Sequence, residues 1–146
     1  VLTLLLVMDS YVELYKGGIV PVADFVNMPY DRDILVRVIV KKTAAHYSYK
    51  SVRISKTDFP VLTCAAALTQ EGVQAAVGAR PAKAALVKDA EQLATLPMTA
   101  EKAQAFAEYA AGLLPTETNP RGSAAYRTHL IKVLTARCLT ELGGKA

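Results

Sequence analysis

Short apolar runs and polar turns alternate over the first thirty residues. Residues 2–8 (LTLLLVM) are almost continuously apolar and predict the end of a helix, whereas residues 10–15 (SYVELY) alternate as a strand does. The glycine pair at 17–18 predicts a turn. We expect a short strand at 19–22 and a brief helical turn at 23–28 to follow.

A stronger strand is predicted at residues 33–42 (DILVRVIVKK). Every second side chain from Ile34 to Val40 is apolar, which places these side chains on one face. Arg37 interrupts the other face, so we expect that face to meet solvent or a partner.

A meander of strands is predicted in the middle of the chain. Residues 46–54 alternate, residues 61–69 are β-branched and small, and residues 73–79 are expected to pair with them across a turn at 70–72. The pattern indicates no further strand beyond Pro81.

The last third of the chain has the period of amphipathic helices. The predicted helices are Asp89–Leu96, Ala100–Leu114 and Ala124–Leu142. Capping residues mark their ends: Asp89 with Gln92, Thr99, Ser123 and the pair Gly143-Gly144. Strands followed by helices predict an α+β fold, an antiparallel meander of three to four strands covered on one face by three helices. A doubly wound nucleotide-binding fold would alternate strands with helices.

Two arginines fall within the buried sector of the last predicted helix. A helical wheel of about 100° per residue places Arg127 and Arg137 among its apolar side chains. Glu141 lies one turn beyond Arg137 and is expected to pair with it. Arg127 has no acid at helical spacing, and a buried guanidinium without partners is too costly to tolerate. We therefore expect Arg127 either to meet an acid or carbonyl groups elsewhere in the fold, or to anchor an interface with another domain or subunit.

The composition is that of a globular protein, with 52% hydrophobic and 21% charged residues in a chain of 146. The net charge of +4 comes from scattered side chains, so we expect no nucleic-acid partner. The longest apolar run, residues 4–8, is far shorter than the roughly 20 residues that cross a bilayer, so no membrane segment is predicted. The chain begins inside an apolar run with no basic stretch before it, which indicates a cut end rather than a signal peptide.

The sequence predicts no catalytic or metal site. Cys64 and Cys138 are far apart and are expected to be reduced, buried thiols of a cytoplasmic protein. His46 and His129 lie in different elements and lack metal-ligand spacing. Neither a nucleophile elbow nor a glycine-rich phosphate loop is present. The acids of the loop Asp31–Asp33 are interpreted as part of a solvated turn.

A basic strand is predicted around Lys50, close to Arg53 and Lys56. Taken by itself it is interpreted as an exposed edge strand whose charges discourage pairing with other sheets. A loop is expected to follow at Ser55 to Phe59.

Several stretches, in order, resemble the FAD-binding subunit of the molybdenum hydroxylases, the family of xanthine dehydrogenase and carbon monoxide dehydrogenase. Residues 121–134 (RGSAAYRTHLIKVL) are similar to the last helix of that subunit, and residues 49–69 to its strand–loop–strand passage. Residues 73–91 resemble the strand and helix that follow, and residues 7–42 resemble the end of the second FAD-binding subdomain. The resemblance covers essentially the whole chain.

The resemblance implies two parts. Residues 1–42 would be the remnant of the second FAD-binding subdomain, the tail of an α/β unit. Residues 43–146 would form a domain like the C-terminal domain of CO dehydrogenase flavoproteins. By the same resemblance, Leu35 matches a strand residue that touches the flavin, and Lys50 matches a lysine at the edge of the isoalloxazine ring. The loop at 55–58 matches a mobile segment near the flavin, and the main flavin-binding loops would precede this chain.

The implied function is that of part of a xanthine dehydrogenase-like, molybdopterin-dependent oxidoreductase, in which electrons pass from [2Fe-2S] clusters to FAD and on to an acceptor. The molybdopterin and the [2Fe-2S] clusters would belong to partner subunits, since this chain lacks a cysteine array for them. This part alone is expected to be inactive. Two other interpretations stay open: a stand-alone α+β interaction or small-ligand module without redox chemistry, and a subunit that has lost flavin and serves as a scaffold.

Overall fold

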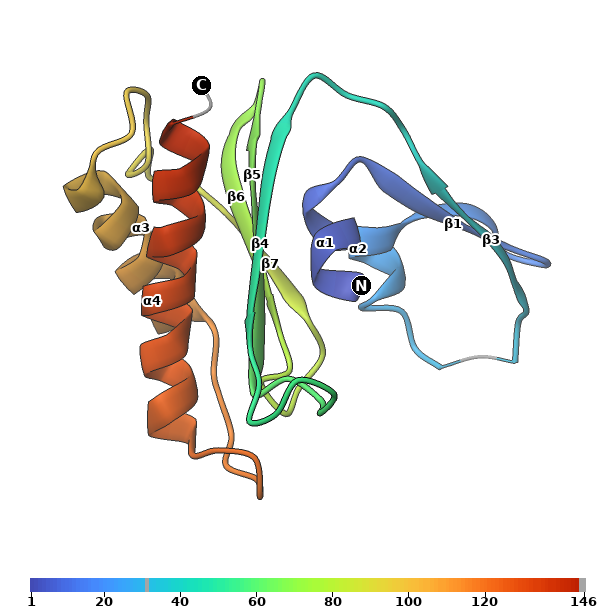
Figure 1. Ribbon diagram of the computed structural model, residues 1–146. Coiled ribbons are helices and arrows are strands. Elements are labelled where there is room, and N and C mark those ends of the chain that lie inside the picture. The colour runs from blue at the N-terminus through green and yellow to red at the C-terminus, as the bar shows by residue number, and fades with distance from the viewer. Residues whose placement is uncertain (31, 145–146) are drawn as a thin grey trace.

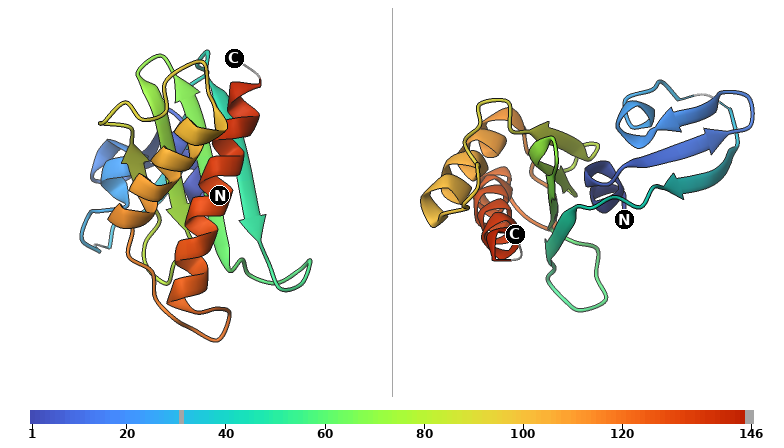
Figure 2. Two further views of the ribbon diagram at one scale, coloured as in Figure 1. Left: turned by 90° about the vertical axis from the view of Figure 1, so that its left-hand side faces the viewer. Right: turned by 90° about the horizontal axis from the view of Figure 1, so that it is seen from above.

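The computed structural model describes residues 1–30 and 32–144, and it confirms the α+β fold with its antiparallel meander. Figure 1 shows three layers: two long helices, a four-stranded sheet, and two short helices with a second, smaller sheet. The views of Figure 2 show the long helices on one face of the four-stranded sheet and the N-terminal elements on the other.

The N-terminal part forms the elements predicted for it. They are α1 (Leu2–Val7), β1 (Ser10–Leu14), β2 (Gly18–Pro21), α2 (Val22–Phe25) and β3 (Leu35–Val40). The three strands form an antiparallel sheet in the order β2-β1-β3, so that β1 is central and β3 lies at an edge.

The face of β3 that carries apolar side chains is exposed. Val36, Val38 and Val40 keep 53%, 45% and 43% of their surfaces exposed, because β3 is an edge strand and the described elements cover little of either face. Arg37, on the alternate face, forms an ion pair with Glu13 of β1. The strand is therefore confirmed, but burial does not follow its apolar pattern.

The loop before β3 is tied to the β1–β2 turn. The carboxylate of Asp33 accepts the backbone N–H groups of Lys16 at 3.0 Å, Gly17 at 2.8 Å and Ile34 at 2.8 Å. This acid therefore orders a turn instead of merely facing solvent. Asp31, the other acid of that loop, lies outside the described residues.

The four-stranded sheet contains the predicted meander and one further strand. Its strands are β4 (His46–Val52), β5 (Leu62–Thr69), β6 (Gly72–Gly78) and β7 (Ala85–Lys88), paired antiparallel in that order. The expectation that no strand follows Pro81 is wrong, because β7 pairs with β6 along its whole length.

The central strand β5 is buried on both faces. Cys64 and Ala66 belong to the core beneath the long helices, whereas Ala65 and Ala67 pack in the core that contains α1. A strand covered on both faces has small or apolar side chains throughout, which explains the continuous run in the sequence. The small side chains let both layers approach the sheet closely.

Two of the three predicted C-terminal helices are confirmed, as α3 (Ala100–Leu113) and α4 (Ala124–Gly143). Thr99 Oγ1 caps α3 by accepting the N–H of Lys102 at 3.3 Å, and Ser123 Oγ caps α4 by accepting that of Tyr126 at 3.2 Å. Among the described residues, no helix has the length and apolar character needed to cross a bilayer.

The predicted helix at Asp89–Leu96 is wrong: this segment consists of turns. The Asp89 carboxylate accepts the N–H groups of Leu93 at 2.9 Å and Ala94 at 2.8 Å. The side chain thus takes the place of backbone carbonyls, and an Asp that competes in this way favours a turn over a helix. Two long helices rather than three therefore cover the sheet.

Of the two alternatives predicted for Arg127, the structure shows the first, in which its guanidinium binds carbonyl groups elsewhere in the fold. It is 1% exposed, and its Nε donates to the carbonyl of Val61 at 3.0 Å. The terminal nitrogens donate to the carbonyl of Glu117 at 2.7 Å, to that of Gly122, and to Oδ1 of Asn119 at 2.6 Å. Its hydrogen bonds are therefore made within this chain.

The expected pair between Arg137 and Glu141 is wrong. Arg137 is exposed on α4, and the carboxylate of Glu141 instead binds Lys50 of β4. The buried side of α4 includes Leu134, Thr135 and Cys138, and the sector predicted from the helical wheel extended beyond it to Arg137.

Candidate functional site

Lys50 lies near the end of β4, which confirms the prediction of an edge strand. Its register partner on β5 is Cys64, so the Lys50 side chain stands on the sheet face that α4 covers. Its Nζ donates to Oε2 of Glu141 at 2.7 Å. The side chain is 32% exposed, which leaves one side of the ammonium group open to solvent.

The carboxylate of Glu141 receives a second hydrogen bond from β4, donated by Ser48 Oγ at 3.0 Å. The hydrogen bond to Glu141 raises the pKa of Lys50 above its ordinary value, against an opposing effect of burial. Lys50 is therefore a permanently charged group near neutral pH. Sequence reasoning missed the role of Glu141, because a contact between two layers has no local spacing by which to find it.

Leu35 opens β3 and is 45% exposed. It borders a mostly apolar cavity of about 410 Å³ whose wall includes Phe25, Met28 and Tyr30. Lys83 also reaches this cavity, where its Nζ donates to the carbonyl of Val26 at 2.9 Å. Leu35 is thus accessible to a ligand in a largely apolar setting.

The two residues implied by the resemblance are not brought into one pocket. Leu35 belongs to the small sheet, whereas Lys50 is turned toward α4 on the four-stranded sheet and does not line the cavity of Leu35. A ligand that contacts both has to reach Lys50 from its exposed side, at the open edge of β4.

The loop between β4 and β5 is held from within and from the α3–α4 connection. Arg53 donates to the carbonyl of Asp58 at 2.5 Å. From the other side, Arg121 lies 3.8 Å from the Asp58 carboxylate and 5.2 Å from the ring centroid of Phe59. Phe59 itself is 73% exposed. The structure therefore gives this loop an exposed aromatic side chain beside basic groups.

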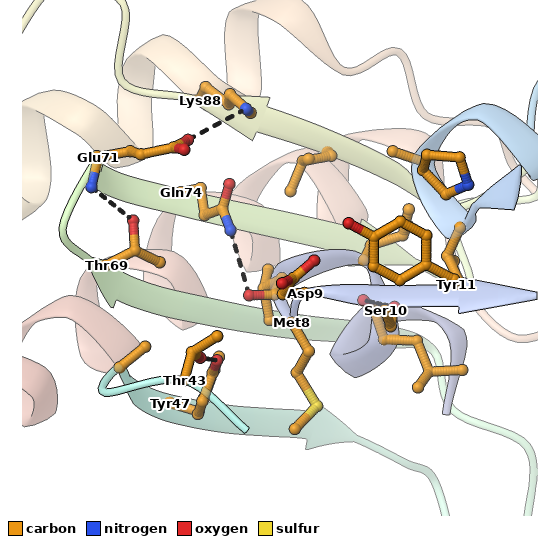
Figure 3. A pocket seen from close by; sticks show the side chains of 18 of the residues that line it. Met8, Asp9, Ser10, Tyr11, Thr43, Tyr47, Thr69, Glu71, Gln74 and Lys88 are labelled. Atoms are coloured by element: carbon orange, nitrogen blue, oxygen red, sulfur yellow. Dashed lines mark hydrogen bonds and ion pairs between the residues drawn. The ribbon is translucent and has the colours of Figure 1, made fainter. Parts of the chain in front are cut away.

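A larger cavity, of about 490 Å³, lies where the end of α1 and the start of β1 meet the four-stranded sheet (Figure 3). Gln74 Nε2 donates to the carbonyl of Val7 at 3.1 Å, and the hydroxyl groups of Thr43 and Tyr47 are 2.8 Å apart. Sequence reasoning selected none of these residues, since they come from separate elements and share no motif.

The two cysteines, distant in sequence, meet in the core between β5 and α4. Both are free and fully buried, as predicted, and Cys64 Sγ lies 3.4 Å from Thr135 Oγ1. Interaction with the Cys138 thiol, together with burial, raises the pKa of Cys64 well above its ordinary value. Cys64 is therefore a packed, neutral thiol. No cluster of three or more potential metal ligands occurs within residues 1–30 and 32–144.

The family model of the CO dehydrogenase flavoprotein C-terminal domain matches residues 47–142, from the start of β4 to the end of α4. No curated protein gives a significant match.

Solved structures resemble almost the whole chain. Quinoline 2-oxidoreductase from Pseudomonas putida 86 matches with a TM-score of 0.84 and 22% identity. A CO dehydrogenase from Hydrogenophaga pseudoflava gives 0.82 and 18%, and one from Oligotropha carboxidovorans gives 0.77 and 20%. Each alignment covers 99% of this chain and 56% of the other, so the chain spans little more than half the length of these proteins.

At these identities the solved structures show a common fold. The family match covers well over half of the sequence, including all of the helix-covered sheet except His46. The chain therefore belongs to the family of CO dehydrogenase flavoprotein C-terminal domains.

Proposed function

We propose that this chain is part of the FAD-binding subunit of a molybdopterin-dependent oxidoreductase, similar to xanthine dehydrogenase. In such an enzyme, electrons pass from [2Fe-2S] clusters to FAD and on to an acceptor. The observation that carries the proposal is the family match over residues 47–142, supported by the likeness in fold to oxidoreductases.

The partners in this proposal are a molybdopterin-binding subunit and a [2Fe-2S] subunit. One of the structures with the same fold is a CO dehydrogenase described as lacking the Mo-pyranopterin moiety of its molybdenum cofactor, and another is a Cu,Mo-CO dehydrogenase. We place the enzyme in the cytoplasm, in keeping with its two free cysteines.

We also propose a domain division at residues 42 and 43. It falls in the connection between β3, which ends at Val40, and β4, which begins at His46. The small sheet would then belong to a subdomain completed by other sequence, which would cover the apolar side chains that β3 leaves exposed.

Two side chains would contact a flavin in this proposal, from separate surfaces of the chain. Leu35 offers a half-exposed apolar contact beside a cavity, and Lys50 offers a positive charge at an open sheet edge. The chain has no glycine-rich loop to hold the phosphates. This part would therefore line one side of the flavin site and would not bind the phosphates.

Bound FAD would supply the redox chemistry, and Lys50 would tune it. A fixed positive charge at the polar edge of the ring favours the added negative charge of the reduced form and so raises the midpoint potential. The raised pKa of Lys50 keeps that charge in place near neutral pH.

The test is the substitution Lys50→Met in the intact flavoprotein, followed by redox titration of the FAD. We expect the midpoint potential to fall by roughly 30 mV or more, which corresponds to about 1.4 kcal/mol for two electrons. Lys132→Met, which removes a charge from α4, serves as the control. An unchanged potential in Lys50→Met would remove the proposed role.

One observation favours a stand-alone ligand-binding module. It is the cavity of about 490 Å³ that residues 43–45 line together with the end of α1 and the start of β1. Its size is that of small-molecule sites. The sequence encoded upstream decides between the two functions: a glycine-rich flavin loop supports the oxidoreductase subunit, and an initiator methionine directly before Val1 supports the module.

A further inference from the structure

Glu141 is placed where helix stability disfavours it. It lies in the last turn of α4, which contains no basic residue. A carboxylate at a helix C-terminus is repelled by the helix dipole and by the unpaired carbonyl groups there. Its position is therefore explained by contacts outside the helix.

Those contacts come from two neighbouring side chains on one face of β4. Ser48 and Lys50 are two residues apart and both donate to Oε2 of Glu141, at 3.0 Å and 2.7 Å. Two donors in a fixed strand hold the carboxylate in place, and the carboxylate in turn fixes the lysine ammonium group.

The cluster of Ser48, Lys50 and Glu141 is buried on the side that faces the core and open to solvent on the other side. Ser48 is 4% exposed, and both Cys64 and Cys138 beneath it are fully buried. Charges beside such a core interact more strongly than they do in water. The outer side, where Lys50 is 32% exposed, is the side open to a ligand.

We infer that Glu141 is a positioning residue for Lys50: its carboxylate holds the ammonium group back against the last turn of α4, thereby limiting how closely Lys50 approaches the flavin and how far it raises the flavin potential. This inference rests on the proposed function, in which Lys50 faces the edge of the flavin.

The test uses the intact flavoprotein with FAD bound and measures the midpoint potential of Lys50→Met, Glu141→Gln and the double variant. Glu141→Gln keeps a hydrogen-bond acceptor but removes the charge. We expect it to raise the potential, with a shift of roughly three- to tenfold in the equilibrium constant for flavin reduction. Lys50→Met should shift the potential the opposite way. The double variant should match Lys50→Met, because Glu141 acts through the lysine.

If Glu141 only stabilised the fold, Glu141→Gln and Lys50→Met would not shift the midpoint potential in opposite directions. Glu101→Gln, a matched change at the start of α3, should leave the potential unchanged. An unchanged potential in Glu141→Gln, or an equal shift of the potential with and without Lys50, overturns the inference. If Glu141→Gln does not fold, Glu141→Asp decides, since its retracted carboxylate should shift the potential the same way by less.

The proposed function fails separately. An intact protein that binds no flavin, or a Lys50→Met variant with an unchanged potential, overturns the oxidoreductase role of Lys50 and the inference with it. If Lys50→Met shifts the midpoint potential and Glu141→Gln does not, only the inference about Glu141 is overturned and the proposed function stands.

Discussion

Arg127 joins two loops through carbonyl groups. Its guanidinium binds Val61, at the end of the β4–β5 loop, and three residues of the α3–α4 connection. Each backbone carbonyl accepts a charged donor, which makes these hydrogen bonds stronger than neutral ones. The residue is therefore a structural clamp between the β4–β5 loop and the α3–α4 connection.

Arg127→Met is expected to lower the free energy of unfolding by about 2–4 kcal/mol, because buried carbonyl groups lose their donors. Arg137→Met, on the exposed side of the same helix, should change it by no more than about 0.5 kcal/mol. Urea unfolding of both variants measures the difference. Equal changes in the free energy of unfolding would mean that the hydrogen bonds from Arg127 to the carbonyl groups do not stabilise the fold.

The pair of Lys50 and Glu141 makes stability depend on alkaline pH. Because the folded pKa of Lys50 is raised above 10.5, the pair contributes fully below that pH and its contribution is lost as the pH rises through the folded pKa. Both side chains are about one third exposed, so we expect a contribution of only about 0.5 kcal/mol.

The measurement compares the unfolding free energies of the natural protein and Lys50→Met from pH 7 to pH 11.5. The gap between them should be constant up to about pH 10 and narrow above it. Lys132→Met, which removes a lysine outside any ion pair of the described residues, should show no such narrowing. A gap that widens with pH contradicts the assignment.

The elements pack through small residues, and the end of α4 illustrates it. A Cβ added at Gly143 would lie 2.5 Å from the Cβ of Met98, whereas one added at Gly112 of α3 meets nothing within 4 Å. The segment before α3 therefore lies directly against the last turn of α4.

Gly143→Ala should destabilise the fold by about 1–3 kcal/mol through this overlap. Gly112→Ala, also within a helix, should stabilise it by about 0.5–1 kcal/mol, because alanine loses less backbone entropy. Thermal unfolding of the two variants gives opposite shifts. A stabilising Gly143→Ala would show that Met98 moves away at little cost.

At the scale of the whole molecule, the exposed apolar surface includes one edge of the small sheet. The apolar side chains of β3 are exposed at the edge of the small sheet, and the alignments reach only 56% of the related chains. In the proposed function, a flavin bound to these residues would lack the glycine-rich loop that holds its phosphates.

Residues 1–146 purified alone are expected to fold without retaining FAD. Each 1.4 kcal/mol of lost interaction weakens binding about tenfold, and several such contacts would be missing. Absorbance between 350 and 500 nm, compared with protein concentration, measures the retained flavin. A stoichiometric yellow protein would contradict the expectation.

The sequence by itself determined the elements whose causes are local. Alternation of apolar and polar side chains predicts the strands β4–β6. Capping predicts the starts of α3 and α4, because Thr99 and Ser123 accept backbone N–H groups only three residues away. The family resemblance likewise follows from ordered stretches of sequence.

Only the tertiary structure decided contacts between layers. It paired Glu141 with Lys50 rather than Arg137, surrounded Arg127 with carbonyl groups, and formed turns where Asp89 competes with the backbone. Such choices depend on which side chain meets which after the sheet and helices pack. A local pattern records which residues must be satisfied, but not the distant groups that satisfy them.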